Sequence, residues 1–147
     1  MKKFLASAIL LSISFSAICQ SAGNYPGDLD KAFGLIKNGA FKQDYKYLIT
    51  FSNVNAAAIN VEPNTSYLIF FVYDNSTHPA TNFKASLMTP DSALKQKYTA
   101  RPFDRAQVGL ARAAQLQFRT KDLQGAATRP VKLDAKPNAT IYAFYKK

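Results

Sequence analysis

The side chains that could perform catalysis are few in this sequence. The 147-residue chain has a single histidine, His78, a single cysteine, Cys19, and no tryptophan. A Ser-His-Asp triad would therefore have to use His78, and the Gly-x-Ser-x-Gly motif of many hydrolases is missing. The sequence predicts a protein that is not an enzyme. A hydrolase with an unrecognised site, drawing on His78, Asp74 or Glu62, is kept as the second alternative function.

Metal ions and phosphate-bearing cofactors also lack their usual ligands here. Zinc sites use cysteine, histidine and carboxylate ligands, and this chain offers one histidine and one glutamate, Glu62, outside its N-terminal segment. The aspartates are scattered, whereas calcium loops cluster their oxygen ligands. The six glycines form no dense loop that could cradle phosphate. We therefore predict no metal site and no cofactor.

Recognition by a basic and aromatic surface is the chemistry that the sequence favours. Its most concentrated basic segment contains Lys95, Lys97, Tyr98, Arg101 and Arg105. In an extended strand, Lys95, Lys97 and Arg101 would point to one face and Tyr98 to the other. Such cations can pair with phosphate, sulfate or carboxylate groups. The alternative interpretation is an edge strand that carries charge to prevent aggregation.

The net charge points to anionic partners. The chain has 19 Lys and Arg residues against 9 Asp and Glu residues, for a formal net charge of +10. Removal of an N-terminal segment holding Lys2 and Lys3 leaves 17 basic residues against 9, a net charge of +8. This favours anionic polysaccharide, lipopolysaccharide or an acidic protein as partner, with nucleic acid less favoured. A basic surface that only maintains solubility is the simpler alternative.

The N-terminus has the pattern of a bacterial export signal. Lys2 and Lys3 precede an uncharged apolar stretch of about 15 residues, which is shorter than the roughly 20 residues that a membrane-spanning helix needs. We predict a signal peptide over residues 1–19, with Ser21–Gly23 as an alternative cleavage region. A lipid anchor on Cys19 is less favoured, because Ile18 stands where lipoprotein signals have a small residue. The mature protein would be periplasmic or extracellular, without a disulfide or a transmembrane span.

The segment after the signal predicts a short helix. Asp28 can cap its start, Gly39 suits its end, and apolar residues recur between them at helical spacing. We expect this helix over residues 28–39, within a leader that covers residues 20–44.

From residue 45 onward the pattern alternates with period two, which is typical of strands. Breaks are expected at Asn53–Asn55 and Lys136–Asn138, and Ser66–Tyr73 should be a central strand covered on both faces. Ala106–Thr120 is ambiguous, and we favour a strand for its second half. The remaining expected strands share this alternation or a short extended pattern, and they are 45–52, 57–61, 83–88, 95–100, 131–133 and 139–145.

About seven or eight short strands separated by turns predict an all-β fold. We expect an antiparallel β-sandwich over residues 45–147 that acts as an exported, non-catalytic binding module of the cell envelope or secretome. It would recognise a polyanionic glycan or an acidic partner. The first alternative is a protein-binding inhibitor or secretion accessory factor that acts through the loops Asp74–Asn82 and Lys121–Thr128.

Overall fold

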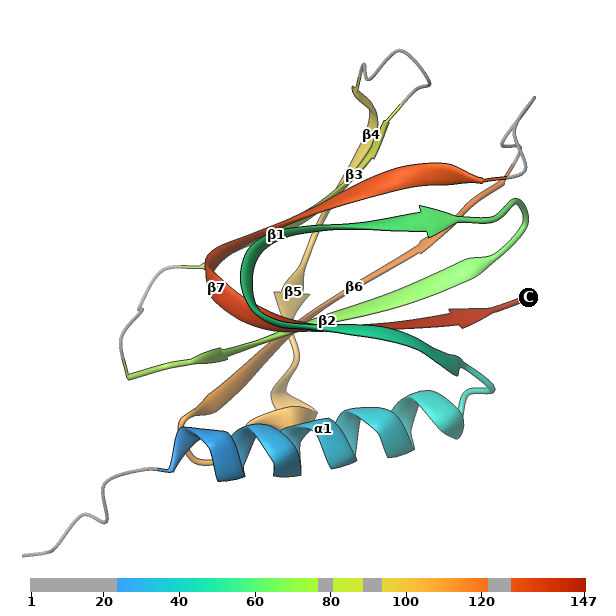
Figure 1. Ribbon diagram of the computed structural model, residues 1–147. Coiled ribbons are helices and arrows are strands. Elements are labelled where there is room, and N and C mark those ends of the chain that lie inside the picture. Colours follow the sequence, from blue (N-terminus) through green and yellow to red (C-terminus); the bar gives the residue numbers. More distant parts are fainter. Residues whose placement is uncertain (1–23, 77–80, 89–93, 122–127) are drawn as a thin grey trace, which may run out of the picture.

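The chain folds into a curled antiparallel sheet with one helix on its outside (Figure 1). The structure is a computed structural model, and it describes residues 24–76, 81–88, 94–121 and 128–147. Outside these residues lie the predicted signal peptide with Cys19, residues 77–80 of the first candidate loop, which include His78, and residues 122–127 of the second. The elements within the described residues are α1 (Tyr25–Phe41), β1 (Lys46–Val61), β2 (Ser66–Asp74), β3 (Asn82–Met88), β4 (Leu94–Thr99), β5 (Arg101–Pro102), a 3-10 turn (Asp104–Ala106), β6 (Ala111–Arg119) and β7 (Arg129–Lys146).

The seven strands of the described ranges form one sheet, which curls into a nearly closed barrel. Strand β7 lies at its centre: β1 pairs along one side of it, while β2 and β3 pair in succession along the other. Strand β6 extends the sheet beyond β2, and β4 extends it beyond β3. The prediction of a β-rich antiparallel fold is confirmed. The prediction of two stacked sheets is wrong, because one continuous sheet encloses the core.

The sheet is continuous because the two expected breaks are irregularities inside long strands and not ends of strands. β1 continues through Asn53–Asn55 with register shifts on both sides of Val54, and Asn53 has a positive φ of 49°. β7 continues through Lys136–Asn138, where the Lys136–Pro137 peptide bond is cis. Val54 pairs with Ala139, so the irregular regions of the two strands face each other. β-bulges bend strands, and both strands curve together at this point in Figure 1.

The barrel interior is built from one face of each strand. On β2, Tyr67, Ile69 and Phe71 point inward and are almost completely buried. Phe83 of β3 stacks on Phe71 with ring centroids 5.0 Å apart. Strand β6, predicted only for the second half of its segment, contributes Leu116. This inward set fixes which side chains of the same strands must face outward.

The helix α1 covers the outer face of β2, β6 and the C-terminal half of β7. Ala32, Ile36 and Ala40 are buried there against Leu68 and Phe70, among others. β2 is thus covered on both faces, as predicted. No helix in the described ranges is long and apolar enough to cross a membrane.

The predicted ends of this helix need correction. It begins at Tyr25, where the side chain of Asn24 accepts a hydrogen bond from the backbone N–H of Gly27, and it ends at Phe41 rather than Gly39. Asp28 is therefore not the N-cap. Its carboxylate lies in the first turn and accepts a hydrogen bond from the backbone N–H of Leu110 at 2.8 Å, which ties the helix to the chain before β6.

Two tyrosines, Tyr25 in the first turn of α1 and Tyr142 of β7 beneath the helix, predict a loss of stability at high pH. Burial, with Asp74 as the second cause, raises the pKa of Tyr25 to about 12, and burial also raises the pKa of Tyr142 to about 12. In the unfolded chain both phenols ionise near pH ~10. As the pH rises, the unfolded state thus loses these protons first. The contribution of the two phenols to the free energy of unfolding is therefore fully present below pH 10 and is lost as the pH rises towards 12.

We therefore expect the free energy of unfolding, measured by urea titration between pH 9 and 12, to fall over this window. The Tyr25→Phe/Tyr142→Phe double variant should show a shallower fall, because it cannot release these protons. An identical slope in the two proteins would contradict this assignment.

Candidate functional site

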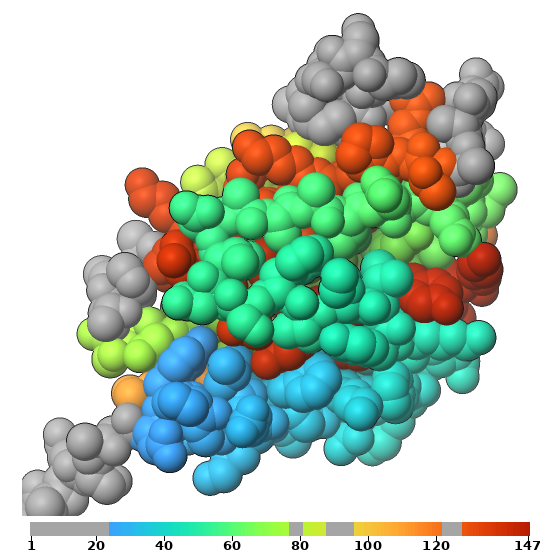
Figure 2. Space-filling model, viewed as in Figure 1, coloured from blue at the N-terminus to red at the C-terminus, as the bar shows by residue number. Residues whose placement is uncertain are grey.

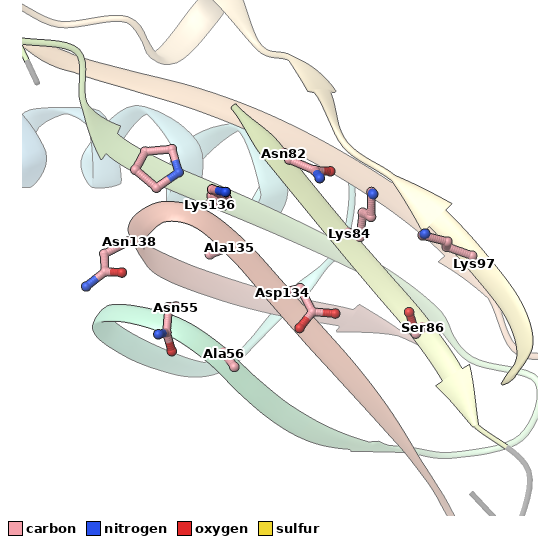
Figure 3. A pocket seen from close by; sticks show the side chains of 11 residues that line it. Asn55, Ala56, Asn82, Lys84, Ser86, Lys97, Asp134, Ala135, Lys136 and Asn138 are labelled. Carbon is pink, nitrogen blue, oxygen red and sulfur yellow. The ribbon is translucent and has the colours of Figure 1, made fainter. Parts of the chain in front are cut away.

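Amine and amide side chains gather on one surface of the described structure. Within the described residues, no three histidine, cysteine or carboxylate side chains come together in a way that could hold a metal ion. The outer face of the sheet instead carries an open cleft of about 680 Å³, beside the bends of β1 and β7 (Figure 3). We call it the lysine cleft; its lining residues are Asn55, Ala56, Asn82, Lys84, Ser86, Lys97, Asp134, Ala135, Lys136, Pro137 and Asn138.

Strand register brings the charged residues of the lysine cleft together. On β3, Phe83 and Ala85 are buried in the core, so Lys84 between them faces outward. Lys84 pairs directly with Asp134 of β7. Next to it, Ser86 pairs with Lys97 of β4.

The amide side chains lie around the bend end of the lysine cleft. Asn82 starts β3 and pairs with Lys136 of β7. Asn138 follows on β7, and Asn55 comes from the facing bend of β1. In Figure 3 the side chains of Asn55 and Asn138 lie close together at this end, while Lys84 and Lys97 extend beside each other from adjacent strands.

The electrostatics of the lysine cleft favour an anion. Asp134 already forms a salt bridge of 3.1 Å with Lys132. Lys84, Lys97 and Lys136 have no salt bridge to any carboxylate of the described residues. The nearby charge of Lys97 is the main cause that lowers the pKa of Lys84, and Asp134 opposes it. Two ammonium groups that repel each other in this way would both gain from an anion bound between them.

The structure places the predicted binding residues at three locations. Lys97 lines the lysine cleft and also an adjoining hollow of about 720 Å³ at the gap between β4 and β6. Arg101 and Tyr98 line that second hollow. Arg105 lies apart, beside α1 in the wall of a small cavity of about 100 Å³. Lys95 belongs to β4, but its side chain lies outside the described part of the structure.

The two faces predicted for this segment are found in β4 where its side chains are described. Lys97 is exposed, whereas the ring of Tyr98 stacks on Phe118 at 4.8 Å and packs against the barrel core. Tyr98 is thus partly a core residue. The edge interpretation also has support, because among the described strands β4 stands at one end of the sheet and pairs with β3 alone.

Sequence reasoning missed Lys84, Lys132, Asp134 and Lys136. All four are outward residues of strands whose alternate residues are buried, and the period-two pattern could have identified their shared face. It could not show that β3 and β7 are neighbours, because they lie about 50 residues apart in the sequence. The predicted binding surface therefore contains only residues that are close together in the sequence.

The arrangement can hold an anion and hydrogen-bond to groups around it. Ammonium groups donate charge-assisted hydrogen bonds to sulfate, phosphate or carboxylate oxygens. Asparagine amides both donate and accept, which matches sugar hydroxyl groups. A scan of the chain against protein-family models and a search of curated proteins both find no match.

Proposed function

We propose that this protein is an exported, non-catalytic binding module of the bacterial cell envelope or secretome that recognises a polyanionic glycan through the lysine cleft. The supporting observation is the excess of positive charge on one sheet face. Among the described side chains of β3, β4 and β7, those facing outward include Lys84, Lys97, Lys132 and Lys136 but only one carboxylate, that of Asp134. The proposed export depends on the N-terminal segment alone.

The composition of the lysine cleft favours a glycan over the other anionic partners. Single-stranded nucleic acid is usually bound by bases stacking on aromatic rings, and none of the described residues that line the lysine cleft is aromatic. The asparagines at the bend end of the cleft instead supply neutral hydrogen-bonding groups next to the lysines. This combination fits an anionic group on a sugar ring that also carries hydroxyls.

The test compares two variants with the same net charge. We expect the wild-type protein to bind immobilised heparin or lipopolysaccharide, and Lys84→Gln/Lys97→Gln/Lys136→Gln to bind about a hundredfold more weakly. This estimate assigns roughly 1 kcal/mol to each lost contact. The salt dependence of binding should also become weaker in this variant, because fewer charges take part. Affinity measured at several ionic strengths checks both expectations.

The matched control is Lys31→Gln/Lys42→Gln/Lys121→Gln, which removes three exposed lysines that do not line the lysine cleft. It should retain most of the affinity. An equal loss of affinity in both variants would mean that binding depends on net charge and not on the lysine cleft. If the wild type is retained no better than on a neutral column, polyanion binding is refuted.

A further inference from the structure

Strand β1 has one hydrogen-bonding edge that no described strand occupies. It runs for 16 residues, from Lys46 to Val61, and it pairs only with β7. Figure 2 shows the atoms of β1 on the face turned towards the viewer, above the helix α1. The free edge forms the rim of the barrel, and it follows the same bend as the strand itself (Figure 1).

This edge lacks the charges that normally protect a free strand. Exposed edges are usually short or carry charged residues, because unpaired N–H and C=O groups attract other strands. The other outer strands of the described sheet are short: β5 has 2 residues, and β4 has 6 residues and carries the exposed Lys97. In contrast, residues 47–61 of β1 contain no charged residue and no proline. An edge of this length and composition is suited to being paired.

The charges at the two ends of β1 identify the occupant. Lys46 begins the strand and Glu62 directly follows it, so the ends carry opposite charges. We propose that β1 pairs antiparallel with β1 of a second copy of this chain, about a two-fold axis near Val54. Lys46 of one copy then lies opposite Glu62 of the other, and both such pairs form because the interface is symmetric.

Side-chain sizes agree with this register. The first half of β1 carries large residues, including Phe51, and the second half carries the small residues Ala56, Ala57 and Ala58. Antiparallel pairing about Val54 places Phe51 of one copy opposite Ala57 of the other. Phe51 thus meets a small residue across the interface and can pack there without crowding, while Ile49 lies opposite Ile59.

The bend in β1 is compatible with the same symmetry. Its irregular region around Val54 divides the strand into two arms, which curve back towards each other. A two-fold axis through the bend exchanges the two copies. The arm before Val54 in each copy then pairs along the arm after Val54 in the other. The pairing would also reduce the exposure of Tyr47, Leu48 and Ile49, which are 44%, 38% and 39% exposed in the single chain.

The first test measures the mass of the purified protein in solution by sedimentation or light scattering. We expect a mass twice that of one chain at micromolar concentration. Ser52→Lys should shift the protein to single chains, since it places two lysines near the axis. Asn38→Lys, which adds the same charge to the exposed face of α1, should remain dimeric.

A charge exchange tests the register. Lys46→Glu should raise the dissociation constant of the dimer by at least about fivefold, because two attractive pairs become repulsive. Adding Glu62→Lys to it should restore much of the affinity; circular dichroism of Glu62→Lys alone checks that loss of its bond to Lys147 leaves the fold intact. A single-chain mass for the wild type would overturn the proposal and leave the edge to a strand of another protein. A dimer indifferent to Ser52→Lys would also overturn it.

Discussion

Phe71→Ala is expected to lower the free energy of unfolding by about 3–5 kcal/mol, the usual cost of removing a large aromatic side chain from a core. Phe71 is fully buried, and its ring stacks on Phe83 with centroids 5.0 Å apart. Its strand neighbours Ala114 and Ile141 also belong to the core, so the missing ring would leave a cavity bounded by three strands. The melting temperature should fall by about 10 °C or more.

Phe41→Ala provides the matched control, because it removes the same side chain from a position that is 45% exposed. Phe41 has an edge contact with Phe144, so we expect a loss below about 1.5 kcal/mol. Urea unfolding of the three proteins measures both differences. If the two variants lose the same stability, Phe71 does not lie in the centre of the core.

The local elements could be predicted well where one physical signal dominated. Ser66–Tyr73 is dense in aromatic and β-branched residues, and it is β2, a central strand covered on both faces. The apolar spacing of Leu29, Ala32, Phe33 and Ile36 predicted the face of α1 that packs on the sheet. In both segments burial and backbone preference favour the same structure, so sequence alone was sufficient.

The overall architecture depended on residues that carry conflicting signals. Asn53–Asn55 and Lys136–Asn138 have turn-forming composition, yet they lie inside continuous strands that pair with each other at Val54 and Ala139. A single sequence shows the tendency to bend but not whether the chain reverses there. That choice separates a sandwich from a curled sheet, and it is made by pairing partners more than 70 residues apart.

The lysine cleft could not be predicted either, because it too depends on pairing between strands that are distant in the sequence. Lys97 was identified because its segment is rich in charge, but Lys84 and Lys136 each stand among apolar or small neighbours in the sequence. Only the pairing of β3 with both β4 and β7 brings them to one surface. A site built across strands becomes visible once the strand order is known.

The link between α1 and the chain before β6 was also unpredicted, and it makes Gly109 a sensitive position. Gly109 has a positive φ of 52°, and a Cβ atom placed there would overlap the carboxylate of Asp28. Gly109→Ala must therefore strain the backbone, which costs about 1–2 kcal/mol. It must also displace the carboxylate that accepts the hydrogen bond from Leu110, at a further cost of about 1–2 kcal/mol. We expect a total loss of about 2–4 kcal/mol in urea unfolding.

Gly34→Ala is the same substitution at a site with the opposite expectation. Gly34 lies inside α1, and apart from its chain neighbours and the nearby backbone of the helix itself, a Cβ atom added there meets no atom within 4 Å. Alanine is the better helix former, so this variant should gain about 0.5–1 kcal/mol. The opposite signs would separate the contact at Gly109 from any general effect of an added methyl group. Equal stabilities for Gly109→Ala and the wild type would mean that Asp28 does not hold the helix to this turn.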